Sequence, residues 1–303
     1  MPSWQASVLN TILSYVARPS ISRGKAKVPL AQVRKKLLEL DKRWLPWPDK
    51  LVSASIPLQH STLLHYVLLD EQARLGKLFY IRGGGFCFKT PHAHARLIAD
   101  ISQRCKLDAY IPDYRLAPEH PFPEPFEDVL EAYRRLIELK GAHNLILMGD
   151  SAGGNLALSL LLELKRLDLP LPQACVLLSP ALDLAMTGDT EFMLGADDPF
   201  FTIESLLRLR GAYLAGANPM SAKVSPLQGN LAELPPILVI AGTRELLLQD
   251  SERLVAQVKA SKGEVQARFY PNMPHVFPLF DLLPEAIEAR EQIKHFVLSH
   301  LIR

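Results

Sequence analysis

From about residue 53 onward, short apolar runs alternate with longer stretches that have the hydrophobic spacing of amphipathic helices. Short apolar runs bounded by turn-forming residues are typical of buried β-strands. Strands that alternate with helices predict a mainly parallel sheet with helices on both faces, which is an α/β fold. The expected strands are the runs LLHYVLL, KLFYI, LDAYI, NLILM, ACVLLS, PILVIA and VQARFY.

Two parts of the chain do not follow this alternation. Residues 1–50 carry apolar side chains at helical spacing, and two prolines in RWLPWPDK end that pattern. Residues from about 183 to 220 contain EFMLGADDPFF and then the helix-like TIESLLRLRGAYL. We expect these two segments to form a helical cap above the sheet of a single domain, residues 1–303.

The composition excludes several classes of protein. With 48% hydrophobic and 22% charged residues, the chain can bury a sizeable core and is not disordered. The net charge is +2, and the basic run at 34–36 fits the solvent side of a helix, so nothing indicates a nucleic-acid partner. No apolar run approaches the roughly 18 residues of a membrane span.

Cysteine usage and the N-terminus bear on the expected compartment. Cys87, Cys105 and Cys175 are odd in number and lie in or beside apolar stretches, as expected for reduced packing residues. The first basic side chain, Arg18, follows the apolar run at 8–16, so a signal peptide is not expected. We expect a cytoplasmic protein.

The motif GDSAGG at 149–154 places Ser151 on a turn between the strand NLILM and the helix NLALSLLLELKRL. A sharp strand-to-helix turn strains the backbone of its central residue and requires very small residues two positions away. Gly149 and Gly153 meet that requirement, and the N–H of Ala152 would face the same space as the exposed hydroxyl. Such glycines can also form a plain turn or bind phosphate at a helix N-terminus. The flanking strand and helix favour a nucleophile.

A neutral serine needs a base, and the base needs an acid that orients it. On this fold the acid and then the histidine follow the serine in the chain. His275 lies in a proline-rich loop just after the last expected strand, whereas His295 and His300 fall on or after the final helix. Glu245 lies four residues past the strand PILVIA and is the preferred acid. Asp250 suits a helix N-cap and remains the alternative.

Three glycines, at 83–85, follow the strand in FYIRGGGFCF. Backbone without side chains lets N–H groups come close to a reacting carbonyl oxygen, which predicts an oxyanion hole here. A nucleotide-binding loop would need a G-x-G-x-x-G pattern or a lysine-bearing P-loop, and neither is present.

Together these motifs resemble the hormone-sensitive lipase family of α/β-hydrolase esterases. The resemblance rests on GDSAGG, DYRLAPEHPFP at 113–123, SPALDL near 179, DPFFT at 198 and LPPILVIAGT at 234, and it spans essentially the whole chain. It implies an eight-stranded, mostly parallel sheet under a helical cap, hydrolysis of carboxylic esters and no cofactor. A homodimer is compatible with the resemblance.

Carried over by position, the resemblance assigns the catalytic roles. It makes Ser151 the nucleophile, His275 the base and Glu245 the acid, with backbone oxyanion donors at Gly84, Gly85 and Ala152. Two positions depart from the family. Arg82 replaces the usual histidine before the glycines, so the loop must be braced by different partners. The acid is a glutamate instead of the common aspartate, which keeps Asp250 in view.

The expected activity is hydrolysis of short- to medium-chain carboxylic esters through a serine acyl-enzyme. An amidase or peptidase on the same fold, or a non-catalytic small-molecule receptor, are the alternatives. His92 and His94 lie two residues apart on an expected helix and point in different directions, so they do not indicate a metal site. Candidates for lining an apolar substrate pocket, or equally for plain core, are Phe86, Phe192, Met193, Phe200, Phe201 and Leu206.

Overall fold

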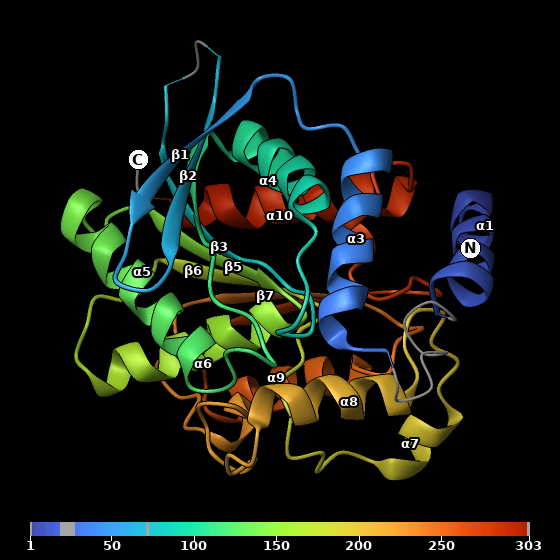
Figure 1. The fold of residues 1–303 in the computed structure, drawn as a ribbon. Helices are drawn as coiled ribbons and strands as arrows, with labels where there is room; N and C mark the ends of the chain where they lie inside the picture. The colour runs from blue at the N-terminus through green and yellow to red at the C-terminus, as the bar shows by residue number, and fades with distance from the viewer. Residues whose placement is uncertain (1, 19–27, 71–72, 302–303) are drawn as a thin grey trace.

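An eight-stranded sheet runs through the molecule in the computed structural model, which describes residues 2–18, 28–70 and 73–301 (Figure 1). The strand order is β1-β2-β4-β3-β5-β6-β7-β8. Pairing is antiparallel from β1 through β2 to β4 and parallel from there on. The strands are β1 Leu51–Pro57, β2 Thr62–Leu68, β3 Gly76–Ile81, β4 Leu107–Pro112, β5 Leu145–Asp150, β6 Ala174–Leu178, β7 Ile237–Gly242 and β8 Val265–Tyr270.

Each apolar run that predicts a strand is a strand in the structure, but β1 has no such run. Its sequence, LVSASIP, buries only Leu51 and leaves most of the strand exposed. β1 exists because it pairs with β2 as a hairpin, from Leu51 opposite Leu68 to Pro57 opposite Thr62. An exposed edge strand needs no continuous hydrophobic run, so the sequence pattern does not reveal it.

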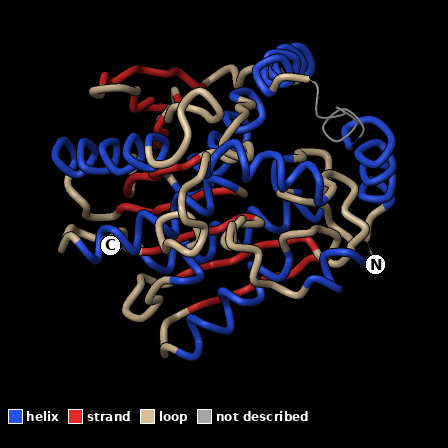
Figure 2. The backbone as a smooth tube through the Cα atoms, turned by 60° about the horizontal axis from the view of Figure 1, so that its bottom comes forward, coloured by secondary structure: helices blue, strands red, loops and turns tan. Residues whose placement is uncertain are grey.

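Successive side chains of a strand point to opposite faces, and the core is therefore divided into two layers. In β5, Leu145 and Leu147 pack into one layer, and Ile146 and Met148 pack into the other. Figure 2 shows helices on both sides of the strands. One layer is covered by α5 Glu124–Lys140, α6 Ala152–Arg166 and α9 Leu248–Ala260, and the other by α4 Pro91–Cys105 and α10 Pro284–His300.

The two segments that break the strand–helix alternation lie to the right of and below the strands in Figure 1. They contact each other, because the guanidinium of Arg208 on α8 donates a hydrogen bond to the carbonyl of Val28, just before α3. Residues 19–27 of the first segment lie outside the described residues. The helices of these segments are α1 Trp4–Ile12, η1 Leu13–Ala17, α3 Leu30–Trp44, α7 Thr190–Gly195 and α8 Ile203–Leu214.

Two short 3-10 turns, η2 Pro226–Gln228 and η3 Phe277–Leu279, complete the elements. Among the described residues, no helix is both long and apolar enough to cross a lipid bilayer.

Candidate active site

Ser151 occupies the turn between β5 and α6 with a strained backbone, φ 52° and ψ −122°. A Cβ on Gly149 would lie 2.5 Å from the Gly153 carbonyl oxygen, and one on Gly153 would lie 2.0 Å from the Ile81 oxygen. Neither position can therefore hold a side chain without moving backbone. This is the crowding that the GDSAGG motif predicts, and it presents the serine hydroxyl at the carboxyl end of the sheet.

The structure brings Ser151, His275 and Glu245 into one hydrogen-bonded line. His275 follows β8, and its Nε2 lies 2.8 Å from the Ser151 Oγ. Glu245 follows β7, and its Oε2 lies 2.7 Å from the His275 Nδ1. Because a carboxylate can only accept, Nδ1 carries the proton and leaves Nε2 free to accept from the serine hydroxyl. All three side chains are buried.

The second oxygen of Glu245 is held by two donors. Its Oε1 accepts hydrogen bonds from the Gly242 N–H at 2.6 Å and from the Ser179 hydroxyl at 2.9 Å. The Ser179 oxygen in turn accepts from the N–H of Val276 at 3.0 Å, so it joins the loop of the acid to the loop of the histidine. Ser179 was not predicted as a site residue, although it opens the motif SPALDL.

Asp198, which opens DPFFT, is a second supporting residue that sequence reasoning did not single out. Its Oδ1 accepts from the N–H groups of Phe200 and Phe201, and its Oδ2 accepts from the N–H of Leu246 at 2.9 Å. It is buried, and it ties the segment before α8 to the residue that follows Glu245.

The environment of His275 favours its protonated form. Burial by itself lowers the pKa of the imidazole, but the hydrogen bond and charge of Glu245 outweigh it and raise the pKa above the ordinary 6.5. The charges of Asp198 and Asp150 add to this rise. The site therefore stabilises the imidazolium that would form when the histidine takes a proton from Ser151.

Asp250, the alternative acid, has a different task. The predicted N-cap is wrong, because α9 begins at Leu248 and Asp250 lies inside its first turn. Its Oδ2 accepts from the N–H groups of Leu182 and Asp183, at 2.6 and 3.0 Å, and so holds the loop after β6. Burial raises the pKa of Asp250 to about 7.

The glycine loop after β3 approaches other backbone too closely for side chains. A Cβ on Gly84 would lie 2.2 Å from the Phe88 carbonyl oxygen, and φ is +118° there and +58° at Gly85. Within the described part of the chain, the N–H groups of Gly84 and Gly85 donate to no other protein group. Gly85 and Ala152 line the same cavity as Ser151, and Gly84 is not among the lining residues.

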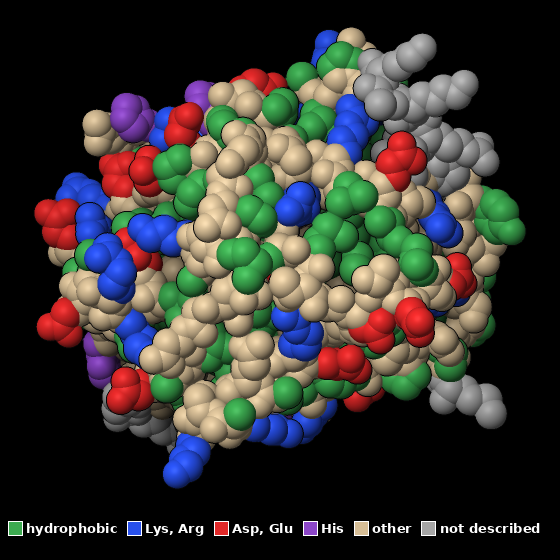
Figure 3. Space-filling model, turned by 90° about the horizontal axis from the view of Figure 1, so that it is seen from below, with side chains coloured by type: hydrophobic (Ala, Val, Ile, Leu, Met, Phe, Trp, Pro, Cys, Tyr) green, Lys and Arg blue, Asp and Glu red, His purple; other side chains and the backbone are tan. Residues whose placement is uncertain are grey.

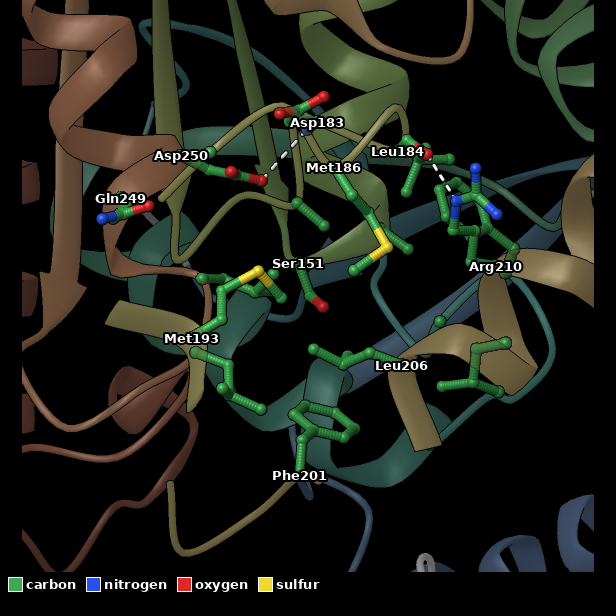
Figure 4. A pocket seen from close by; sticks show the side chains of 18 residues that line it. Ser151, Asp183, Leu184, Met186, Met193, Phe201, Leu206, Arg210, Gln249 and Asp250 are labelled. Carbon is green, nitrogen blue, oxygen red and sulfur yellow. Dashed lines mark hydrogen bonds between the residues drawn. The ribbon is translucent and has the colours of Figure 1, made fainter. Parts of the chain in front are cut away.

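A cavity with mainly apolar walls opens beside the Ser151 hydroxyl (Figure 4). Four of the six candidate residues line it, namely Phe86, Met193, Phe201 and Leu206. Phe192 and Phe200 are not among the lining residues. On the short helix α7 the adjacent Met193 takes the inward position instead of Phe192, and the Phe200 ring packs against Phe201, 4.9 Å between centroids.

Comparison with known proteins places these features in a family. Residues 78–279 match the family described as alpha/beta hydrolase fold. An esterase of Acinetobacter venetianus is 35% identical over 226 residues, 73% of this chain and 74% of the relative. This chain belongs to the α/β-hydrolase family. An acetyl-hydrolase of Streptomyces hygroscopicus is 34% identical over 217 residues, 71% of this chain and 72% of the relative.

Solved structures confirm the more specific resemblance of this α/β-hydrolase. A hormone-sensitive lipase from a metagenome library matches with a TM-score of 0.89 at 27% identity and covers 100% of both chains. The protein EstE5 matches with a TM-score of 0.89 at 30% identity over 99% of each chain. The predicted eight-stranded fold and the kinship with hormone-sensitive lipase family esterases are therefore confirmed.

Arg82, the departure from the family pattern, braces the glycine loop of this α/β-hydrolase. Its buried guanidinium donates to the carbonyls of Phe88 and Tyr114 and to the Asp113 carboxylate, 2.9 Å away. It also lies 4.4 Å from the centroid of the Tyr114 ring. Arg82 thus ties the end of the glycine loop to the segment that follows β4. Burial raises the pKa of Asp113, but the charges of Arg82 and Lys89 outweigh it and lower that pKa.

His94 has a protein partner and does not form a metal site with His92. Its Nε2 lies 3.2 Å from Asp150, whose Oδ1 also accepts from the Tyr80 hydroxyl and the Gly83 N–H, both at 2.8 Å. Asp150 thus anchors the start of the glycine loop next to the serine turn. Across the described ranges, no group of three or more histidine, cysteine, aspartate or glutamate side chains is arranged to hold a metal ion.

Proposed function

We propose that this α/β-hydrolase is a carboxylesterase that works through a serine acyl-enzyme. The observation that carries the proposal is the line of two short contacts from Ser151 through His275 to Glu245, 2.8 and 2.7 Å, beside an apolar cavity. Relatives named as an esterase and as an acetyl-hydrolase support hydrolysis of esters as the activity.

In the first stage the Ser151 oxygen attacks the ester carbonyl carbon while His275 takes the hydroxyl proton at Nε2. The electron pair of the carbonyl π bond moves to the oxygen, which becomes an oxyanion. The free N–H groups of the glycine loop and the N–H of Ala152 stabilise this oxyanion. Each such donor contributes about 2.7–4 kcal/mol to lowering the barrier. Glu245 holds the imidazole in the required tautomer and stabilises its positive charge.

The tetrahedral intermediate then collapses. The bond from the carbonyl carbon to the alcohol oxygen breaks, and His275 gives its proton to that oxygen. The alcohol is released, and Ser151 remains as an acyl ester. In the second stage water takes the place of the alcohol, loses a proton to His275 and attacks the acyl carbon. The serine leaves with that proton, and the carboxylic acid is released.

The cavity supports short to medium acyl chains as substrates. Its walls are mainly apolar, as expected for a site that takes an acyl chain. The side chains of α7 and α8 form its outer wall with Met193, Leu206 and Leu209. None of the described residues before Gly85 lines it, so among the described residues the cap segment at 183–220 faces the substrate, and residues 2–18 and 28–50 do not.

The test is a series of p-nitrophenyl esters from acetate to palmitate, assayed with wild type and Ser151→Ala. We expect the highest kcat/KM with butyrate or hexanoate, an initial burst of nitrophenol, and loss of nearly all hydrolysis in Ser151→Ala. Unchanged hydrolysis in that variant would favour a non-catalytic binding protein. Faster cleavage of a matched p-nitroanilide than of the ester would favour an amidase.

A further inference from the structure

Helix α1 packs against the body through one narrow face, to which Leu9 contributes a partly buried side chain. Of its residues, Ala6 and Asn10 are buried, and the Asn10 side-chain amide donates to the Asn272 carbonyl at 2.9 Å. Ser3, the N-cap, donates from its N–H and its hydroxyl to Glu285 at the start of α10. Ala6, Leu9 and these hydrogen bonds hold the helix to the body, and its other large apolar side chains remain on the opposite face.

The large apolar side chains of this helix and its continuation η1 point to solvent. Trp4 is 72% exposed, Val8 48%, Ile12 51% and Tyr15 79%. The successive spacings are four, four and three residues, which place these side chains on one face of the helix. The four side chains therefore form a single stripe, which we call the outer α1 face. Single exposed apolar residues are normal, but a continuous apolar stripe marks an interaction site.

The N-terminal segment is also strongly basic. Residues 1–38 contain seven lysines and arginines and no aspartate or glutamate. Because the whole chain has a net charge of +2, residues 39–303 carry −5. Arg18 follows the outer α1 face directly, and Lys35 and Lys36 on α3 are exposed. A surface that combines apolar side chains with positive charge is complementary to anionic lipid.

We propose that the outer α1 face binds the surface of an anionic lipid membrane. The helix would lie in the plane of the interface, with the Trp4 and Tyr15 rings at the level of the headgroups and Val8 and Ile12 below them. A second copy of the chain fits less well. Four side chains cover less than the roughly 800 Å² per partner that a stable dimer buries, and two basic segments would repel each other.

The position of α1 relates this surface to the cavity. Arg18 lies 4.0 Å from Asp197, which follows α7, the helix that supplies Met193 to the cavity wall. In Figure 1, α1 and α7 occupy the same side of the molecule. On the face seen in Figure 3, hydrophobic side chains gather in one area among polar ones. A lipid surface bound at α1 would therefore lie next to the helices that line the cavity.

Vesicle flotation tests the proposal with the full chain carrying Ser151→Ala, so that no hydrolysis alters the lipid. We expect binding to vesicles of phosphatidylcholine mixed with phosphatidylglycerol, weakened by salt, and little binding to pure phosphatidylcholine. The variant W4A/V8S/I12S should bind at least about tenfold more weakly. Arg18→Gln should weaken binding about fivefold. Since Ser151 is absent, the result does not depend on the proposed function.

The matched control is L69S/L139S, which replaces two leucines that are 60% and 42% exposed and remote from α1, one directly after β2 and one on α5. Its binding should equal that of the parent. Equal binding to charged and neutral vesicles, or full binding by W4A/V8S/I12S, would overturn the proposal. So would a change from dimer to monomer in W4A/V8S/I12S with vesicle binding intact, since that would assign the face to a second copy.

Discussion

Replacing Glu245 by glutamine should remove the catalytic tautomer of His275 while changing the shape of the site very little. Glu245 Oε1 accepts from the Gly242 N–H and the Ser179 hydroxyl, and Oε2 accepts from His275 Nδ1. A glutamine must turn its carbonyl oxygen toward Gly242, because an NH₂ group there would face a backbone N–H. Its NH₂ group then faces His275.

That arrangement reverses the tautomer of the His275 imidazole. Nδ1 has to accept from the amide, so the proton moves to Nε2, where it points at the Ser151 oxygen and cannot accept the serine proton. A reversed tautomer of this kind costs about 10⁴ in kcat. At about 1.36 kcal/mol for each factor of ten, this is about 5.4 kcal/mol of transition-state stabilisation. The fold should be unaffected, since every atom keeps its place.

The assay is kcat for p-nitrophenyl butyrate at pH 8 in Glu245→Gln, with Asp250→Asn as the matched control. Asparagine keeps a carbonyl oxygen for the N–H groups of Leu182 and Asp183, so Asp250→Asn should retain kcat of the wild-type order. Circular dichroism checks that both variants fold. A Glu245→Gln enzyme within tenfold of wild type, or a larger loss in Asp250→Asn, would refute the reasoning.

Three other results are expected. Because the pKa of His275 is raised above 6.5 and only the neutral ring is a base, log kcat/KM should fall with unit slope as pH drops through a midpoint above 6.5; a midpoint below 6.5 would contradict this. Gly153→Ala should abolish activity and lower the free energy of unfolding by about 1–3 kcal/mol, because its Cβ would meet the Ile81 oxygen. Gly211→Ala has open space around it in α8, so it should raise the free energy of unfolding, measured in urea, by about 1 kcal/mol. The pKa of Asp250 is raised from 3.8 to about 7 in the folded protein, so the folded state holds a proton that the unfolded state has lost, and stability falls as pH rises between these values. Asp250→Asn should therefore raise Tm at pH 8 and change it less at pH 4. An equal shift of Tm at both pH values would argue against this linkage.

The central, parallel part of the sheet is predictable because its strands are buried on both faces. In β5 every residue from Leu145 to Asp150 is buried, which requires the continuous apolar run that the sequence shows. The antiparallel edge is not predictable in this way, because β1 depends on pairing with β2 and not on its own burial.

Within the site, Ser151 is recognisable from its neighbours and His275 from its order in the chain. The roles of Ser179 and Asp198 depend on contacts with loops that lie 66 and 48 residues further along, which no local pattern encodes. The choice between Phe192 and Met193 is set by the direction in which a six-residue helix packs. Hydrophobicity cannot decide it, since both side chains are apolar.

Because the triad residues are far apart in the chain, the return of hydrolytic activity during refolding reports when the loops that carry them have come together. The serine and histidine are 124 residues apart, and the loops after β7 and β8 must both dock before any turnover can occur. All three tryptophans, at positions 4, 44 and 47, lie in the N-terminal segment, so their emission follows a different part of the molecule. Recording hydrolytic activity and tryptophan emission during refolding would show whether the first fifty residues fold before or after β7 and β8 complete the sheet.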